Sequence, residues 1–381
     1  MCRDGRRSRG RSRSRWIPVL IVLLGLTSCQ TGGPGRPSTP PPTSPETSTP
    51  GSSGGAQLEQ PPATVERRTA TAPATNAESG GIAPATETNV ATATATTAVA
   101  PTASAGAAVP NFDHIYVIVF ENKELTDVVG SESAPYLNSL IHQYGLATSY
   151  TGVAHPSQPN YLAIWAGSTF GVADDGVHDL TGETLGDQLE AADKTWGIYA
   201  ENYPVGPSNA NPSCFVGASA SDGGSGSGSY SRKHDPAMSF VGLSGNASRC
   251  AIHVTSLSRF DAASSEFSMI VPDSCHDMHD CPVATGDAWL SSWLPAHILN
   301  TDTWKETNSA LFITWDEGDS ETGGGGIVPM IVVSNQTPVG FRSSVSHDHY
   351  SLLATIEAGW NLGCLRNACT ATTLAEFFGG R

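Results

Sequence analysis

The stretch HIYVIVFENK, residues 114–123, joins a strong strand pattern to an abruptly polar end. Its first seven residues are almost all apolar or β-branched, which is typical of a strand buried on both faces. Glu121 and Asn122 follow without a spacer. The stretch therefore predicts a central strand whose carboxyl end carries oxygen-bearing side chains.

Further strand-like and helical runs alternate along the rest of the chain. Strand-like runs occupy residues 195–200, 267–271, 310–315 and 327–333, and helical patterns occupy 134–145, 183–193, 287–299 and 349–360. This alternation indicates an α/β fold, with a mostly parallel central sheet sandwiched by helices. In such sheets the reacting groups gather at the carboxyl ends of the strands.

Polar residues follow four of these strands directly. They are Glu121-Asn122, Glu201-Asn202, Asp316-Glu317, and the segment 273–281 with its sequence HDMHD. Carboxylates crowded at one sheet edge repel one another unless a cation compensates, and oxygen ligands with an occasional histidine suit a divalent metal. Each segment alone also fits a solvated turn or a disulfide-bounded loop. Their coincidence at four strand ends predicts a divalent metal site.

Ser157 lies between two prolines, in the sequence HPSQPNY, and an apolar helical run follows it. Proline restricts its own φ angle and the conformation of the residue before it, so the loop is rigid. Free amide groups at a helix start attract anions, and a serine there can act as a nucleophile. The alternative is an ordinary helix N-cap.

Two basic segments complete the candidate site. Arg232, Lys233 and His234 form a dense positive patch, which could clamp a phosphate or could be a surface loop. His347 and His349 flank the start of the last long helix, and either could donate a proton to a leaving alkoxide unless both are exposed.

The N-terminal third has a different character. Residues 1–29 combine an arginine-rich start, an apolar run and a cysteine after small residues. This predicts a signal peptide whose lipobox makes Cys29 a lipid anchor, the alternative being a plain signal with an incidental cysteine. Residues 30–110 are rich in Thr, Ala and Pro, which predicts a disordered linker. Residues 111–381 are long enough for one catalytic domain.

Charge and cysteine content narrow the function classes. The chain carries a net charge of −16, and seven of its arginines lie within the first 15 residues. So acidic a body argues against nucleic-acid partners, and against membrane contact other than through the anchor. We expect a monomer that is exported, either as an envelope lipoprotein or in secreted form. Pairs Cys275–Cys281 and Cys364–Cys369 would leave Cys214 with Cys250, one of 15 possible pairings.

Six motifs occur in an order that resembles a known family. They are ENK (121–123), HPSQPNY (155–161), RKH (232–234), DMHD (277–280), TWDEGD (314–319) and HYSLLATIE (349–357). The set is similar to the bacterial phosphoesterase family of phospholipases C and acid phosphatases, within the alkaline-phosphatase-like superfamily. The resemblance spans most of the folded domain, and is greatest to secreted acid phosphatases that act on phosphatidylinositol 3-phosphate and simpler monoesters.

The resemblance implies a role for each motif. Glu121, Asn122, Asp316 and Glu317 would hold a divalent metal, and Ser157 would be the nucleophile. Substrate would contact Asn160, Arg232, Lys233, His234 and Asp280, and either His279 or His349 would be the acid. The presence of both His347 and His349 leaves open which one faces the site.

Together these observations predict a metal-dependent phosphomonoesterase, with a phosphate monoester or a phospholipid as substrate, that works through a phosphoserine. One alternative is a phospholipase C-type phosphodiesterase built on the same core. The other is a surface lipoprotein that binds a partner through an inactive domain, although the expected carboxylates and serine are all present.

Overall fold

The computed structural model describes residues 108–204, 214–220 and 228–379. The predicted signal peptide, Cys29 and almost all of the predicted linker lie outside these residues. Within them, no helix is both long enough and apolar enough to cross a bilayer.

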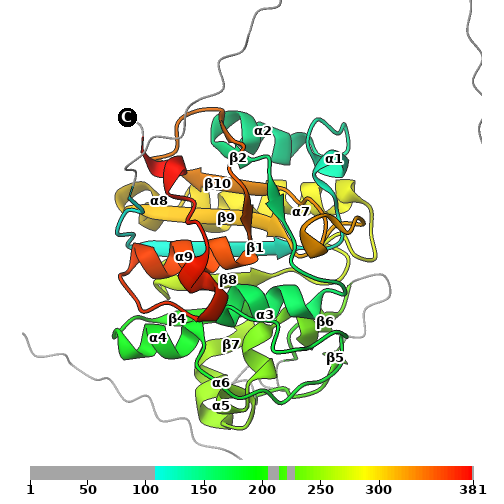
Figure 1. The fold of residues 1–381 in the computed structure, drawn as a ribbon, viewed down its shortest axis with the longest axis vertical. Coiled ribbons are helices and arrows are strands. Elements are labelled where there is room, and N and C mark those ends of the chain that lie inside the picture. The colour runs from blue at the N-terminus through cyan, green and yellow to red at the C-terminus, as the bar shows by residue number, and fades with distance from the viewer. Residues whose placement is uncertain (1–107, 205–213, 221–227, 380–381) are drawn as a thin grey trace, which may run out of the picture. The chain divides into compact units, whose positions relative to one another are not determined.

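A sheet of eight strands forms the centre of the described domain, in the order β11-β2-β10-β9-β1-β8-β4-β7 (Figure 1). The strands are β1 (His114–Phe120), β2 (Gly145–Ala147), β4 (Trp196–Ala200), β7 (Val254–Ser256), β8 (Phe267–Val271), β9 (Ser309–Trp315), β10 (Met330–Ser334) and β11 (Phe341–Ser343). All neighbours are parallel except β10, which runs antiparallel to both β9 and β2. The predicted α/β fold with a mostly parallel sheet is confirmed.

β1 lies in the interior of the sheet, between β9 and β8, because its side chains are apolar on both faces. It pairs in parallel with β8 and β9, in a register that sets Val117 opposite Met269 on one side and Phe312 on the other. All three residues are completely buried. The strand predicted at 327–333 begins three residues later than expected, at Met330.

Helices cover both faces of the sheet, as Figure 1 shows for α3 and α9 in front and α7 behind. They are α2 (Pro135–Gln143), α3 (Gln158–Ala166), α4 (Leu185–Ala191), α7 (Val283–Leu294) and α9 (His349–Gly359), with shorter turns between them. α3 packs on α9 and α2 packs on α7. The helix predicted at 287–299 is α7, which starts four residues earlier and continues as a π-type turn from Pro295, a residue without an amide hydrogen.

Three disulfides join Cys214 to Cys250, Cys275 to Cys281 and Cys364 to Cys369. This is the pairing expected from the sequence. The second bridge closes the loop after β8, and the third closes a loop after α9.

The backbone hydrogen bonds of the sheet continue past the ends of its strands. The amide of Glu121 donates to the carbonyl of Asp277, and the amide of Asp316 donates to the carbonyl of Phe120, at 2.8 and 2.9 Å. The polar residue after β9 is therefore held by the sheet ladder, and the one after β1 is held by the backbone of the loop that follows β8.

Candidate active site

Ser157 lies immediately before α3 and reaches the carboxyl end of β1. Its side chain is buried and makes no capping hydrogen bond to the helix. The hydroxyl donates to Oε2 of Glu121 at 2.9 Å, and Nζ of Lys233 donates to the hydroxyl oxygen at 3.2 Å. The hydroxyl is thus held between a carboxylate and an ammonium group.

Asn160 holds the loop in front of Ser157. Its Oδ1 accepts hydrogen bonds from the amides of Val153 and Ala154, at 2.8 and 3.1 Å, and its Nδ2 donates to the carbonyl of Ala154 at 2.8 Å. These contacts differ from the expected one, in which the amide points at phosphoryl oxygens. The side chain is engaged with backbone and is completely buried.

Glu121, His234 and Asp277 form a buried row beside the hydroxyl. Nε2 of His234 lies 3.0 Å from Oε1 of Glu121, and Nδ1 lies 3.4 Å from Oδ2 of Asp277. The hydroxyl of Tyr161 donates to Oε1 of Glu121 at 2.7 Å, and its ring stacks on the imidazole with 5.1 Å between centroids.

The electrostatics of this row favour a charged imidazole. Burial alone would lower the pKa of His234, but the charges of Glu121 and Asp277 raise it to about 10. Burial would raise the pKa of Glu121, but His234 and Lys233 bring it down to about 2. The pKa of Asp277 stays raised because burial outweighs its longer contact with His234. The row therefore favours the charged form of the His234 imidazole, paired with the Glu121 carboxylate that contacts Ser157.

Asp316 has the surroundings of a cation ligand. Its Oδ1 accepts from the amide of Asn122 at 3.0 Å, while its Oδ2 is buried with no hydrogen-bond partner among the described residues. Burial, with the charges of Glu121 and Glu317, raises the pKa of Asp316 well above its usual range. A buried, unsatisfied carboxylate beside two others fits a divalent ion, which prefers oxygen ligands.

Two further residues line the same edge. Asn122 has a φ of 54°, in the left-handed region that asparagine tolerates, so the chain turns sharply after β1. Oε2 of Glu317 lies 2.6 Å from Nδ1 of His155, and Nε2 of that ring is 3.1 Å from the carbonyl of Ser320. The four predicted metal ligands thus follow β1 and β9 at the same sheet edge, but both oxygens of Glu121 already have donors. Among the described residues, the acidic and histidine side chains with three ligand atoms within 4.8 Å of one another are instead Glu201, Asp273 and His276.

Arg232 faces away from Ser157, contrary to expectation. Its guanidinium is buried and donates to the carbonyls of Val216, His178 and Met238. The residue joins three loops, while the next residue, Lys233, supplies the cation at the hydroxyl. Arg232 and Lys233 occupy successive positions of a 3-10 turn, Arg232–His234, in which neighbouring side chains point about 120° apart.

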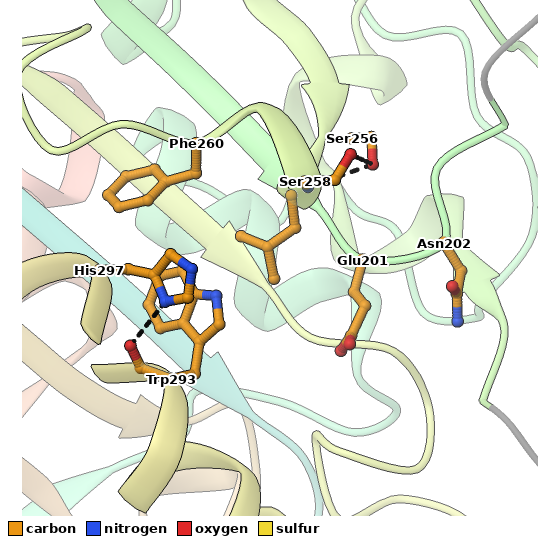
Figure 2. Close-up of a pocket in the computed structure, with 8 residues that line it drawn as sticks. Glu201, Asn202, Ser256, Ser258, Phe260, Trp293 and His297 are labelled. Carbon is orange, nitrogen blue, oxygen red and sulfur yellow. Dashed lines mark hydrogen bonds between the residues drawn. The ribbon is translucent and has the colours of Figure 1, made fainter. Parts of the chain in front are cut away.

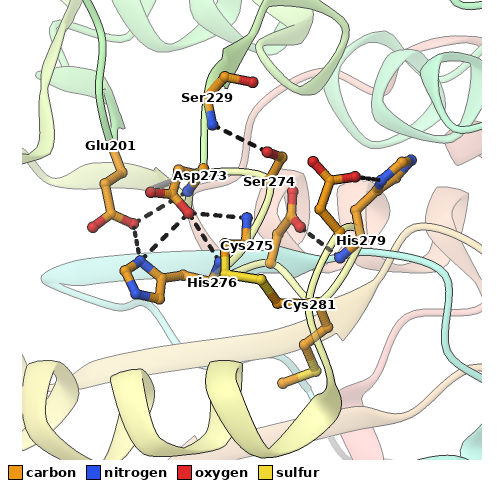
Figure 3. The surroundings of a disulfide bond; sticks show 12 residues. Glu201, Ser229, Asp273, Ser274, Cys275, His276, His279 and Cys281 are labelled. Carbon is orange, nitrogen blue, oxygen red and sulfur yellow. Dashed lines mark hydrogen bonds and ion pairs between the residues drawn. A yellow bond between two sulfur atoms is a disulfide. The ribbon is translucent and has the colours of Figure 1, made fainter. Parts of the chain in front are cut away.

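The histidines predicted as proton donors have different surroundings. His279, labelled in Figure 3, is exposed, and its Nδ1 lies 2.7 Å from Oδ1 of Asp280. His349 is completely buried, with Nδ1 3.0 Å from the hydroxyl of Tyr150 and Nε2 2.5 Å from the carbonyl of Asp316. Burial lowers the pKa of His349 to about 4.

His347 is directed away from this group. Its Nε2 pairs with Glu376 at 2.7 Å, whereas Nε2 of His349 contacts the backbone carbonyl of Asp316, so His349 is the one of the two that lies beside a predicted metal ligand.

A second polar cluster follows β4 and β8. Glu201, Asp273 and His276 place one ligand atom each within 4.8 Å of one another, a spacing that could hold a metal (Figure 3). They are already joined by hydrogen bonds, with Nδ1 of His276 2.9 Å from Oε2 of Glu201 and Oδ1 of Asp273 accepting from the amide of His276 at 2.9 Å. Glu201 also lines a cavity of about 320 Å³ with Asn202, Phe260, Trp293 and His297 (Figure 2). The polar ends of the strands thus form two clusters.

Four residues of the site were not assigned from sequence. Tyr161 and His155 belong to the HPSQPNY motif and Asp277 to DMHD, so the motifs contained them without indicating their contacts. Asp175 contacts Lys233 from an exposed loop with no pattern of its own, at 3.0 Å. No sequence signal marks it.

Comparisons with known proteins identify the family of the chain. Residues 128–363 match the phosphoesterase family. The chain is 30% identical over 278 residues to a phosphatidylinositol-3-phosphatase of Mycobacterium tuberculosis, with 72% of this chain and 86% of that protein covered. It is 27% identical to an acid phosphatase of Aspergillus fumigatus, covering 69% of this chain but 58% of that longer protein.

Among solved structures, a phosphonate monoester hydrolase of Agrobacterium radiobacter aligns with a TM-score of 0.45 and 13% identity, over 71% of this chain and 78% of that one. A protein of the alkaline phosphatase superfamily from Vibrio parahaemolyticus aligns with a TM-score of 0.43 and 10% identity, over 68% of this chain and 70% of that one. The family match and the Mycobacterium relative carry the assignment: the chain belongs to the phosphoesterase family and is a hydrolase of phosphoric esters.

Proposed function

We propose that the protein is an exported, metal-dependent phosphomonoesterase that works through a phosphoserine at Ser157. The observation that carries the proposal is the position of its hydroxyl, 2.9 Å from Glu121 and 3.2 Å from Lys233. A serine nucleophile needs a carboxylate or metal to orient and activate it, and cations to receive the phosphoryl charge.

Asp316, Glu317 and Asn122 would hold the divalent ion. When bound, such an ion lowers the pKa of a nearby hydroxyl and screens the charge on phosphoryl oxygens. We assign Glu121 to Ser157 rather than to the metal as a primary ligand, because its oxygens accept from Ser157 and Tyr161. Its carboxylate fixes the direction of the serine hydroxyl.

The cations supply the rest of the site. Oε2 of Glu121, which accepts the hydrogen bond of the hydroxyl, takes the serine proton as Ser157 Oγ bonds to phosphorus and the bond from phosphorus to the alcohol oxygen breaks. Water later hydrolyses the phosphoserine, which releases phosphate and restores the serine hydroxyl. Lys233 and the charged His234 neutralise the phosphoryl oxygens in the loose transition state. Asn160 contributes by holding the loop in front of Ser157.

His279 is the better candidate for protonating the leaving alcohol. It is exposed and paired with Asp280, so it can exchange protons with solvent. Both nitrogens of His349 are occupied, and its lowered pKa keeps it neutral, so we assign it to positioning Asp316.

The substrate class follows from the relatives. One is named for phosphatidylinositol 3-phosphate and the other as an acid phosphatase, so we propose a phosphate monoester, either lipid or soluble. Export is supported by three disulfides, which persist in oxidising compartments. The lipid anchor at Cys29 and the monomeric state stay proposals from the sequence.

Ser157→Ala tests the proposal, because alanine removes the nucleophile and leaves the buried loop its shape. We expect hydrolysis of p-nitrophenyl phosphate to fall to background, with an unchanged circular dichroism spectrum. A chelator should also abolish the wild-type rate, and added divalent ions should restore it. Normal turnover by the variant would exclude the phosphoserine. Faster hydrolysis of phosphatidylcholine than of phosphatidylinositol 3-phosphate would favour the diesterase alternative.

A further inference from the structure

Asp175 occupies a position beside Ser157 that no assignment of the site explains. Its Oδ1 accepts from the amide of Gln158 at 3.0 Å, and its Oδ2 pairs with Nζ of Lys233 at 3.0 Å. One carboxylate therefore bridges the residue after the nucleophile and the cation at the nucleophile.

These two donors are the ones that a phosphoryl group would need. The next two residues of α3 supply no further hydrogen-bond donor for a phosphoryl group. Pro159 has no amide hydrogen, and the amide of Asn160 donates to the carbonyl of Ser157 at 3.0 Å. The Gln158 amide is therefore not used within the helix; it donates to Asp175 at the helix start, where anions are favoured. Lys233 lies within hydrogen-bond distance of the attacking oxygen.

The segment that carries Asp175 can be displaced without disturbing the core. Residues 173–177 are all exposed, and a third of the Asp175 side chain is open to solvent. By contrast, Glu121 and Asp316 are completely buried. A carboxylate and a phosphoryl group each present two oxygens on one centre, so both can bridge the same pair of donors.

We propose that Asp175 is an internal competitor for the phosphoryl site, holding the Gln158 amide and Lys233 until substrate displaces it. The inference rests on the proposed phosphoserine function. Substrate and product phosphate each bind by taking over two hydrogen bonds from the carboxylate. The competitor weakens the binding of both, and it assists release of product because it returns as phosphate leaves.

Asp175→Asn is the sharpest variant, because the amide oxygen can still accept from Gln158 while the charge facing Lys233 is lost. Asp179→Asn is the matched control: it removes the same charge from the same loop, but its carboxylate lies 3.7 Å from Arg232 and has no contact with Ser157 or Lys233. Inorganic phosphate is titrated calorimetrically into each protein with added divalent ion, and its competitive inhibition constant is measured in parallel.

We expect Asp175→Asn to bind phosphate about five- to tenfold more tightly than wild type, since a partly exposed charged contact is removed from competition. Asp179→Asn should stay within about twofold, the size of a general charge effect. Unchanged or weaker phosphate binding by Asp175→Asn would overturn the inference, and would make Asp175 a residue that caps α3 and orients Lys233. Turnover by Ser157→Ala would exclude the phosphoserine mechanism. The comparison of phosphate binding between Asp175→Asn and Asp179→Asn would still test the competitor role of Asp175, provided that the wild type binds phosphate.

Discussion

At the scale of residues, one carboxylate organises the site. Glu121 accepts from Ser157 and Tyr161 and lies beside His234, so three groups of different chemistry depend on its two oxygens. Buried carboxylates are stable only when donors or cations surround them. The arrangement explains why the residue after β1 must be acidic, whichever residues hold the metal.

Tyr161→Phe tests this organising role. The ring can still stack on His234, but the hydrogen bond to Glu121 is lost. Losing a hydrogen bond to a charged group costs about 1.5–3 kcal/mol. We expect kcat to fall by about tenfold or more with a smaller change in KM, measured with p-nitrophenyl phosphate at fixed metal concentration.

A purely structural role for Tyr161 predicts a different outcome. The melting temperature would then fall while kcat of the remaining folded enzyme stayed at the wild-type value. Measuring both quantities on the same preparation separates the two roles.

The sequence predicted the positions of individual site residues best where a motif directly follows a strand or precedes a helix. Ser157, Glu121 and Asp316 are brought together as expected. Arg232 points elsewhere, because residue type does not reveal which way a side chain leaves a short turn. Asp175 was missed because a loop acid has no local pattern, and its meaning depends on contacts with residues 17 and 58 positions away.

At the scale of elements, the loop after β8 connects the chemistry to a disulfide. Cys275–Cys281 closes the loop that carries Asp277, whose carboxylate lies 3.4 Å from His234. The preceding residue, His276, contacts Glu201 instead. The bridge therefore fixes a segment that contributes to two clusters at once.

Replacing both Cys275 and Cys281 by alanine should lower activity as well as stability. Removing a cross-link across so short a loop costs about 2 kcal/mol of unfolding free energy, and it also frees Asp277 from its place beside His234. We expect kcat to fall several-fold at a temperature where the variant is fully folded, as judged by denaturant titration.

The matched control removes Cys364 and Cys369. This bridge spans a sequence separation of 5 instead of 6, and it follows α9 rather than β8. Its loss should cost similar stability and leave kcat near the wild-type value. Equal losses of kcat in both double variants would contradict a specific role for the loop after β8.

Elements themselves were predicted well where strands are buried on both faces. β1, β8 and β9 match their expected positions within one residue, since continuous apolar runs are bounded by polar residues. The direction of β10 and the early start of α7 were not predicted, because pairing partners and helix starts depend on contacts distant in sequence.

At the scale of the whole molecule, stability should vary with pH through buried acids away from the site. Glu357 in α9 is buried; its Oε1 accepts from the amide of Leu365 at 2.8 Å and its Oε2 has no partner among the described residues. Burial raises the pKa of this carboxyl from 4.5 to about 7. The folded protein therefore prefers the protonated form.

Glu357→Gln should stabilise the protein at pH 8 and have little effect at pH 4. Between pH 4.5 and 7 the unfolded chain ionises this group first, so the wild type loses stability as pH rises and the loss is complete above about 7. The maximum is about 3 kcal/mol. Chemical denaturation of wild type and Glu357→Gln at both pH values measures the difference in unfolding free energy. An equal increase in stability at pH 4 would show that packing, not ionisation, is responsible.

The hydrogen-bond ladder that runs past β1 and β9 has a consequence for how the site fluctuates. The amides of Glu121 and Asp316 donate to Asp277 and Phe120, so they belong to the same cooperative unit as the central strands. Their protons can exchange with solvent water only when that unit opens. The amide protons of Glu121 and Asp316 should therefore exchange as slowly as those of the central strands. The exposed segment 173–177, which carries Asp175, can open without the core.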